Sequence, residues 1–394
     1  MQYRKFGKID FSVSALGFGA MRLPVQNGNI NEVEAINMLH YAINKGLNYI
    51  DTAYIYHEGQ SESLVGKALK NSYRDKVHLA TKLPSWKVKS SADFDRFLNE
   101  QLVRLKVDYL DFYLLHALDK KEWPKLRDLG VLEWAEKAIA EGRFRYLGFS
   151  FHDEHAVFRQ IVDAYEWAMC LIQYNYMDIN NQAGLDGLRY ASEKGIAVAI
   201  MEPLLGGRLA APTSSVQSAV WDKAATQRTT VEWALQWLWN QPEVATVLSG
   251  MSSMEQVKEN IVYASASGIG KLTPDELSLF DQARKMHESL TAIPCTNCGY
   301  CMPCPFNVDI PENISNYNDA GMYERLEASI NKYNSWKADA EKSQGKTNDM
   351  RAACCTDCKE CESKCPQNIP ISNWMPVIHN VMAEGKPFIK RLDL

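Results

Sequence analysis

Up to about residue 265, short apolar runs alternate with longer amphipathic stretches. The apolar runs predict eight strands: Ala15–Phe18, Tyr49–Thr52, Val77–Thr81, Tyr109–Leu115, Tyr146–Phe149, Leu171–Tyr174, Ala197–Met201 and Val244–Leu248. The amphipathic stretches predict helices such as Glu32–Lys45, Ser61–Lys70, Ser91–Leu105, Leu132–Glu141, Leu185–Lys194, Thr229–Asn240 and Met254–Ala264. Strands separated by helical patterns of about 10–15 residues are typical of βαβ units and a parallel sheet. Eight such strands in one domain favour an α/β fold of the (β/α)8 TIM barrel type.

A second zone follows the barrel pattern. Thr273-Pro274-Asp275-Glu276 has the form of a capping box with proline at the first helical position, so we expect a helix running toward His287. A cysteine-rich region comes next, interrupted by a polar spacer from about Asn316 to Thr347 that we expect to be helical. We therefore expect two domains, residues 1–289 as the barrel and residues 290–394 as a small, mainly helical domain.

Eight cysteines near the C-terminus form two groups with ligand spacing. The first cysteine group is Cys295-x2-Cys298-x2-Cys301-x2-Cys304-Pro305, and the second is Cys355-x2-Cys358-x2-Cys361-x3-Cys365-Pro366. Three thiolates at this spacing bind three corners of one cubane, and the cysteine before proline reaches the other cluster. The sequence thus predicts a domain with two [4Fe-4S] clusters. The expected ligand sets are crossed: Cys295, Cys298 and Cys301 with Cys365, and Cys355, Cys358 and Cys361 with Cys304.

Zinc and disulfide bonds are the alternatives for these cysteines. Zinc sites usually pair two short CxxC segments and lack the Cys-Pro ending. Disulfides need an oxidising compartment, for which the rest of the sequence gives no indication. Two further cysteines lie outside the groups: Cys170, in an apolar run, is expected in the core, and Cys354 is a rival of Cys355 that breaks the x2 spacing.

Composition narrows the function classes. The chain of 394 residues is 46% hydrophobic and 23% charged, which is ordinary for a globular protein. Its net charge of −5 provides no basic surface for nucleic acid. The N-terminal residues contain no continuous apolar leader, and no later stretch approaches membrane-spanning length. We expect a protein of the reducing cytoplasm with neither nucleic acid nor membrane as a partner.

Polar residues follow three consecutive predicted strands. Asp51 and Tyr56 follow the second strand, Lys82 the third and His116 the fourth. Since catalytic groups of such barrels lie at the C-terminal strand ends, these side chains are expected to converge. An ammonium lowers the pKa of a neighbouring phenol, which would make Tyr56 a general acid, with Asp51 holding Lys82 and His116 polarising a carbonyl oxygen. A single strand-end histidine is more often structural, so the prediction depends on the set of four.

The sequence resembles the aldo-keto reductase superfamily. The stretches that carry the resemblance are GLNYIDTAYIYHEGQSE, LATK, DFYLLH, LGFS, LIQYNY, AIMEPLLGGRL and SGMSSMEQVKEN, spread over most of residues 1–265 in the family's order. The cysteine-rich tail is similar to the ferredoxin-type extension of a bacterial and archaeal subgroup. Asp51, Tyr56, Lys82 and His116 match the catalytic tetrad of the family. Tyr54 is a rival phenol at the wrong spacing.

The resemblance also implies a nicotinamide dinucleotide site. Ser150 and Gln173 match residues that hold the carboxamide, and Met201 stands where many relatives stack a tyrosine on the nicotinamide. Other matches are the pyrophosphate loop at 202–207, with Pro203, Leu204 and Gly206, and the adenine contacts Glu259 and Asn260. Phe151 replaces the usual asparagine after Ser150. Gly250 and Gln256 replace the Lys and Arg that often bind a 2′-phosphate, so the cofactor is NAD(H) or NADP(H), with NADH expected to bind at least as tightly as NADPH.

The expected activity is nicotinamide-dependent reduction of a small aldehyde or ketone, but a hydride donor and one-electron clusters do not exchange electrons easily without a flavin. No segment carries a recognisable flavin fingerprint, which leaves a flavin without sequence support. Three interpretations follow: clusters that connect the reductase to a redox protein such as a ferredoxin, clusters that only stabilise a small domain, or an electron-transfer module with the barrel as a docking scaffold. The sequence predicts no oligomeric state. Candidates for the substrate pocket are Trp86, Trp123 and the segment 209–227, and packing roles are equally expected for each.

Overall fold

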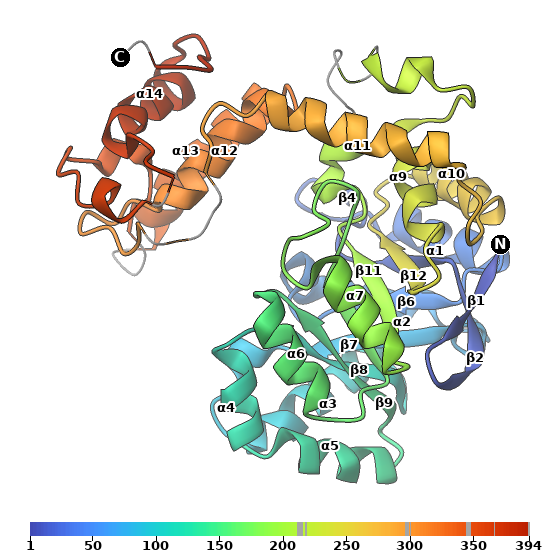
Figure 1. Cartoon of the computed structure of the whole chain (residues 1–394). Coiled ribbons are helices and arrows are strands. Elements are labelled where there is room, and N and C mark those ends of the chain that lie inside the picture. Colours follow the sequence, from blue (N-terminus) through green and yellow to red (C-terminus); the bar gives the residue numbers. More distant parts are fainter. Residues whose placement is uncertain are drawn as a thin grey trace. The chain divides into compact units, whose positions relative to one another are not determined.

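The computed structural model describes residues 1–210, 216, 219–295, 299, 301–343, 348–365 and 367–392. Eight parallel strands close into a barrel in the order β10-β11-β12-β3-β6-β7-β8-β9 (Figure 1). Their bounds are β3 Leu16–Gly19, β6 Tyr49–Asp51, β7 His78–Leu83, β8 Leu110–Leu118, β9 Phe144–Phe151, β10 Met169–Gln173, β11 Ala197–Met201 and β12 Val244–Ser249. Each overlaps one of the eight predicted strands, and the TIM-barrel prediction is confirmed.

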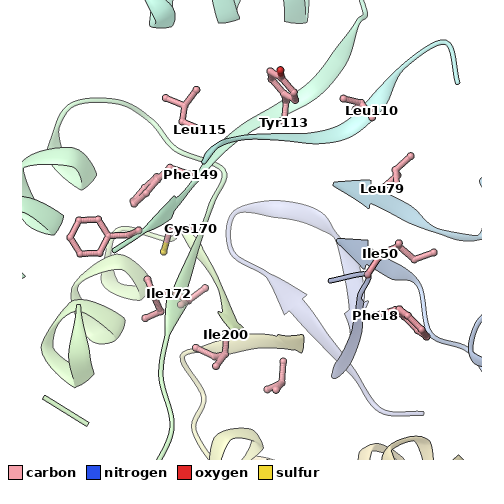
Figure 2. Close-up of a cluster of buried hydrophobic side chains, with 14 of the residues drawn as sticks. Phe18, Ile50, Leu79, Leu110, Tyr113, Leu115, Phe149, Cys170, Ile172 and Ile200 are labelled. Carbon is pink, nitrogen blue, oxygen red and sulfur yellow. The ribbon is translucent and has the colours of Figure 1, made fainter. Parts of the chain in front are cut away.

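Alternation along the strands sorts side chains into two buried layers. Tyr49, Ala80, Phe112 and Leu114 belong to the cluster inside the barrel. Their sequence neighbours belong to the larger cluster between strands and helices, where Figure 2 labels Ile50, Leu79, Tyr113, Leu115 and Phe149 among others. Both faces of each strand are therefore buried, which explains why the strands read as continuous apolar runs.

Helices connect the strands and lie outside the ring. They are α1 Glu32–Asn44, α2 Gln60–Ala68, α3 Ala92–Leu105, α4 Glu122–Asp128, α5 Val131–Ala140, α6 His155–Asp163, α7 Gly184–Glu193, α9 Thr230–Trp239 and α10 Met254–Ser265. All seven predicted helices of the barrel are present, within a few residues at each end. The helices α4 and α6 were not among those predicted.

Two hairpins precede and interrupt the first βα unit. Strands β1 (Tyr3–Phe6) and β2 (Ile9–Ser14) are antiparallel, and Phe6 packs on Tyr49 and Phe112 inside the barrel. The short pair β4 (Val25–Gln26) and β5 (Asn29–Ile30) lies in the loop between β3 and α1. That loop also contains Arg22.

The chain separates into two compact units. The first comprises Met1–Leu209 and Arg228–Leu277, and the second comprises 210–227 and Ser278–Leu394. The division falls within α11 (Pro274–Ser289), which begins with a reciprocal capping box: Glu276 N donates to Thr273 Oγ1, and Thr273 N donates to Glu276 Oε2. The predicted cap is therefore present. The proposed boundary near residue 290 remains a sequence-based expectation.

The second unit is mainly helical, as expected. It contains α12 (Ile310–Met322), α13 (Leu326–Lys342) and α14 (Ile371–Glu384). The first two helices correspond to much of the predicted spacer. A separate hydrophobic core includes Tyr317, Tyr333 and Trp374. No helix in the described ranges is both long and apolar enough to cross a membrane.

Candidate functional site

The catalytic candidates lie at the C-terminal ends of three adjacent strands. Asp51 is the last residue of β6, Lys82 lies near the end of β7, and His116 lies near the end of β8. Each is two or four residues beyond an inward-facing core residue of its own strand, namely Tyr49, Ala80 and Phe112. The two-residue period of a strand thus places all three on the inner side of the barrel.

Lys82 links the acidic and phenolic groups. Its side chain is fully buried, and Nζ donates to Asp51 Oδ1 at 2.5 Å and to the backbone oxygen of Thr52 at 2.8 Å. Nζ also lies 3.2 Å from the hydroxyl oxygen of Tyr56, to which it donates. A buried ammonium needs such partners because an unpaired charge in the interior is costly. The structure therefore brings Asp51, Tyr56 and Lys82 together.

The two tyrosines after β6 have different surroundings. Tyr56 begins the 3-10 helix η1 (Tyr56–Gly59), and its hydroxyl faces Lys82. The hydroxyl of Tyr54 instead donates to Glu100 of α3 at 2.8 Å, and its ring packs edge-on against Phe97. Tyr54 is therefore part of the contact with α3, and Tyr56 is the phenol of the candidate site.

Burial determines the proton affinity of the phenol. It raises the pKa of Tyr56 above the usual value, while the charge of Lys82 lowers that pKa and the charge of Asp51 raises it. The expectation that Lys82 gives Tyr56 a lowered pKa is wrong, because the loss of hydration raises this pKa more than the ammonium lowers it. Burial lowers the pKa of Lys82, but Asp51 and Tyr56 raise it more, so Lys82 remains protonated. Tyr56 consequently retains a transferable proton at neutral pH.

His116 completes the set. Its ring lies 6.0 Å from that of Tyr56 between centroids, at an interplanar angle of 83°. Burial and the nearby charge of Lys82 hold the pKa of His116 well below its usual value, so the imidazole is neutral. Its buried Nδ1 makes no hydrogen bond within the part of the chain that the structure describes. A neutral imidazole can donate one hydrogen bond to a substrate oxygen without competing with Tyr56 as the acid.

One of the two candidate tryptophans lies beside this set. Trp86, in the 3-10 helix η3 (Ser85–Lys87), is 42% exposed, and its ring centroid is 5.1 Å from that of His116. Trp123 is only 4% exposed and packs edge-on against Trp167. Trp123 is thus a core residue, and Trp86 is available to a substrate. Of the candidate segment 209–227, residues 211–215 and 217–218 lie outside the described residues.

A buried polar network supports Lys82 from behind. Gln101 of α3 donates to the backbone oxygen of Lys82 at 3.0 Å and to Glu62 Oε1 of α2 at 2.6 Å. Thr81 donates to the same Glu62 oxygen at 2.7 Å, and Arg104 forms an ion pair with the other at 3.2 Å. The sequence analysis missed this network. The signal was Glu62 and Gln101 on the apolar faces of their predicted helices, where unpaired polar groups would be costly.

The carboxamide candidates have partners that orient them. Ser150 of β9 accepts a hydrogen bond from Ala117 N at 2.7 Å, which leaves its hydroxyl hydrogen to donate. Ala117 has a φ of 53°, and the β8–β9 register shifts there, directly after His116. Gln173, the last residue of β10, donates to Asp178 at 2.8 Å and accepts from Gln182 at 2.8 Å. Asp178 and Gln182 are positioning residues that the sequence did not indicate.

The expected pyrophosphate loop follows Met201, the last residue of β11. Its backbone takes left-handed conformations at Glu202, Leu205, Gly206 and Gly207. A Cβ placed on Gly207 would meet no atom of the described residues within 4 Å, so this part of the loop is open among them. Pro203 is buried and Leu204 half-buried, which anchors the loop. An open glycine loop is suited to the close approach of a phosphate.

The remaining cofactor candidates lie at the end of β12 and on α10. Gly250 follows β12, and Asn260 is buried with Nδ2 3.1 Å from Ser249 Oγ. Glu259 is exposed on α10. Gln256, also exposed, accepts a hydrogen bond from Ser252 N at 2.8 Å. The donors, the open loop and the neutral imidazole together fit a nicotinamide dinucleotide.

The cysteines of the second unit line two cavities. One small cavity is lined by Cys304 together with Cys355, Cys358 and Cys361. A second small cavity is lined by Cys295 and Cys301 together with Cys365. Cys301 also borders the first cavity. Each cavity thus receives cysteines from both sequence groups, and this grouping matches the crossed ligand sets.

The chemistry of the cavity linings suits iron–sulfur clusters. All nine described cysteines are free of disulfide bonds. Within the described ranges, no three His, Cys, Asp or Glu side chains converge as ligands of a single metal ion. Cys354 donates to the backbone oxygen of Asp349 and does not line either cavity, whereas Cys355 does. Cys298 lies outside the described residues, and Cys170 is fully buried in β10, as predicted.

Comparison with known proteins identifies the family. A model described as "Aldo/keto reductase family" matches residues 15–285. The chain belongs to the aldo/keto reductase family. A second model, described as a 4Fe-4S dicluster domain, matches residues 294–370. The resemblance found in the sequence is confirmed: the chain is an aldo/keto reductase-type oxidoreductase with a C-terminal 4Fe-4S domain.

Relatives cover the reductase barrel. The chain is 29% identical to the uncharacterized oxidoreductase YqkF of Bacillus subtilis, over 72% of this chain and 97% of YqkF. It is 28% identical to the L-galactose dehydrogenase of Arabidopsis thaliana, over 71% and 92% of the two chains. The solved aldo-keto reductase AKR11C1 of Bacillus halodurans, in its holo form, is 28% identical with a TM-score of 0.61, over 72% and 96%. An aldo-keto reductase of Klebsiella pneumoniae solved with NADPH is 26% identical with a TM-score of 0.60, over 71% and 94%.

Proposed function

We propose that this aldo/keto reductase reduces an aldehyde or ketone with a nicotinamide dinucleotide as hydride donor. The observation that carries the proposal is the hydroxyl of Tyr56, which lies 3.2 Å from the buried, protonated Lys82 held by Asp51. This arrangement keeps a proton donor of defined orientation at the mouth of the barrel. The NADPH complex of the Klebsiella relative supports the choice of hydride donor.

A bound NAD(P)H would supply the hydride to the carbonyl carbon. Tyr56 would then give its proton to the oxygen on which negative charge develops, and neutral His116 would donate a hydrogen bond to the same oxygen. Lys82 stabilises the phenolate that remains, and Asp51 holds Lys82 in place. Ser150 and Gln173 would hold the carboxamide. Trp86 beside His116 favours a carbonyl substrate with an apolar or aromatic part.

Replacement of Tyr56 by Phe tests this proposal. The change removes the proton donor but keeps the ring, so turnover with a test aldehyde should fall by roughly two to four orders of magnitude. Binding of NAD(P)H, measured by fluorescence titration, should be almost unchanged. Tyr54→Phe is the matched control: it removes a hydroxyl two residues away that bonds to Glu100, and turnover should remain near wild type. Full activity of Tyr56→Phe would remove Tyr56 from the mechanism.

For the second domain we propose two [4Fe-4S] clusters that exchange single electrons with a redox protein such as a ferredoxin. The two cysteine-lined cavities support two clusters. The thiolate ligands would suit a reducing cytoplasm. The alternative is that the clusters only stabilise the domain. Its own apolar core, which includes Ile314, Tyr317 and Ile378, favours the redox interpretation, because the domain is not as poor in apolar residues as a purely structural role would require.

An anaerobic titration separates these alternatives. NADH and NADPH are added to cluster-loaded protein while the visible absorbance of the clusters is followed. Bleaching would join the nicotinamide and the clusters in one electron pathway. Carbonyl reduction without bleaching would favour clusters that act only as a structural support, and bleaching without carbonyl reduction would favour an electron-transfer module.

A further inference from the structure

Arg22 occupies a position between two cofactor loops that come from distant parts of the sequence. A side-chain Cβ placed on Gly250, after β12, would lie 3.1–3.3 Å from the Cβ, Cγ and Cδ atoms of Arg22. A Cβ placed on Gly206, in the loop after β11, would lie 3.6 Å from Nη2 of Arg22. The aliphatic stem of Arg22 therefore passes Gly250, and its guanidinium reaches the open glycine loop.

The surrounding residues hold the backbone next to Arg22 in place. Leu23 is 2% exposed, and its backbone N–H donates to Nε2 of His57 at 3.0 Å. Burial lowers the pKa of His57, which keeps this nitrogen unprotonated and able to accept. Gly250 contributes by lacking a side chain, because any Cβ there would crowd the stem of Arg22. Gly250 stands where relatives often have a cation, and its lack of a side chain leaves room for Arg22.

The side chain of Arg22 is exposed. No hydrogen bond, ion pair or ring contact joins it to any other residue in the part of the chain that the structure describes. Other cations near the cofactor loops differ in this respect. Arg208 acts electrostatically on the carboxyl of Asp178, and Lys258 lies over the ring of Tyr41, 5.9 Å from its centroid. The guanidinium of Arg22 is therefore positioned to meet an anion at Gly206.

We propose that Arg22 binds the pyrophosphate of the dinucleotide. The inference rests on the proposed function and adds a residue to its cofactor site. The guanidinium lies at the Gly206 end and only the stem lies at Gly250, so the contact is with the pyrophosphate and not with a 2′-phosphate. Because NADH and NADPH share the pyrophosphate, Arg22 strengthens both without discriminating between them. The forked guanidinium can bond two phosphate oxygens at once.

The test compares dissociation constants, measured by calorimetry at fixed salt, for NAD⁺, NADP⁺ and adenosine. Arg22→Met keeps most of the stem and removes the charge. It should weaken NAD⁺ and NADP⁺ by the same factor, about 10- to 100-fold for one charge-assisted contact, and leave adenosine unchanged. Arg22→Lys should recover part of the loss. Arg96→Met is the matched control, because it removes an exposed arginine of α3 that pairs with Asp93 and Glu100, and all three affinities should stay at wild type.

The outcomes separate this inference from the proposed function. Wild-type affinity of Arg22→Met for both dinucleotides would overturn the role of Arg22 while leaving the reductase proposal intact. A loss confined to NADP⁺ would also overturn it, because it would assign Arg22 to the 2′-phosphate. A wild-type protein that binds neither dinucleotide would overturn the proposed function and this inference together. Equal losses for both, with adenosine unchanged, support the pyrophosphate contact.

Discussion

Lys82 combines complete burial with a positive charge, and its partners explain how the fold tolerates it. Asp51 neutralises the charge, Thr52 supplies a backbone acceptor, and Tyr56 supplies a third oxygen. Removing one member of a buried ion pair typically costs about 3–5 kcal/mol, since the other charge stays behind. The same partners fix the ammonium next to the phenol. Stability of the barrel and orientation of the acid therefore depend on the same contacts.

The pH dependence of turnover should report the proton on Tyr56. Burial raises the pKa of this phenol, so carbonyl reduction should stay constant through neutral pH and fall only as pH rises through that raised value. Alcohol oxidation needs the phenolate and should increase over the same range. Since the charge of Asp51 raises this pKa, Asp51→Asn should move the alkaline limb to lower pH. The measurement is kcat against pH in both directions, and an upward shift in Asp51→Asn would contradict it.

Cofactor preference should respond to position 256. Without the usual cations, wild type is expected to bind NADH at least as tightly as NADPH. Gln256→Arg places a cation at the exposed first turn of α10 and should shift preference toward NADPH by roughly tenfold, about 1.4 kcal/mol. Gln256→Met is the control, because it also loses the hydrogen bond from Ser252 N but gains no charge. Dissociation constants at fixed salt decide the matter, and a wild type that strongly prefers NADPH would contradict the expectation.

The positions of the catalytic residues could be read from the sequence, but their environments could not. Asp51, Lys82 and His116 were predicted because they lie at the ends of strands, and the end of a strand can be recognised from the local sequence. The sign of the Tyr56 pKa shift required the burial contributed by several elements. Arg22 was missed because its role depends on Gly206 and Gly250, which belong to loops far away in the chain. The sequence was compatible with Trp123 either in the core or in the substrate pocket. Its contact with Trp167 shows that it is a core residue.

At the scale of elements, α2 and α3 are packed unusually closely behind β7. A Cβ on Gly66 of α2 would lie 2.4 Å from the backbone oxygen of Leu105 at the end of α3. This contact involves backbone atoms, which cannot rotate away as a side chain can. The close approach also brings Glu62 and Gln101 within hydrogen-bond distance of each other beneath Lys82.

Gly66→Ala should therefore destabilise the protein. Alanine in a helix is normally favoured over glycine by up to about 1 kcal/mol. Here the clash should dominate and cost about 1–3 kcal/mol of unfolding free energy, measured by urea denaturation. Gly268→Ala is the control: the three atoms nearest to its Cβ would all belong to the flexible side chain of Lys271, so the change should remain within about 0.5 kcal/mol. A stabilised Gly66→Ala would show that the two helices can separate freely.

The elements themselves were largely predictable, for physical reasons that also explain some of the omissions. Strands buried on both faces form continuous apolar runs, and all eight were found. Helix α11 was found from its capping box, whose two hydrogen bonds are present. Helix α4 has only 7 residues, too few turns for a clear helical period. Helix α6 has 9 residues, as many as the predicted helix α2, so its length does not explain the omission. Helix α14 follows the second cysteine group directly. This segment was interpreted from its cysteine spacing, so the helix was not predicted.

At the scale of the whole molecule, the cysteine cavities make a numerical prediction. With both sites filled, anaerobic protein should contain about eight iron and eight sulfide per chain. Crossed ligation assigns Cys304 and Cys355 to the same cluster, so the double variant Cys304→Ala/Cys355→Ala should retain about four iron. The control, Cys301→Ala/Cys355→Ala, should lose both clusters in either arrangement. Near-complete loss of iron from the first double variant would show that each cysteine group holds its own cluster.

The mixed lining of the cavities has a consequence for biosynthesis. Cys295 and Cys301 leave the ribosome 70 and 64 residues before Cys365, which lines the same cavity. The barrel strands emerge earlier still, so the reductase domain can begin to fold while the first cysteine group has no complete coordination sphere. If two clusters are bound by the crossed ligand sets, neither could be completed before translation reaches the second cysteine group. Delivery of iron and sulfide would then be a late step that acts on a chain whose barrel is already formed.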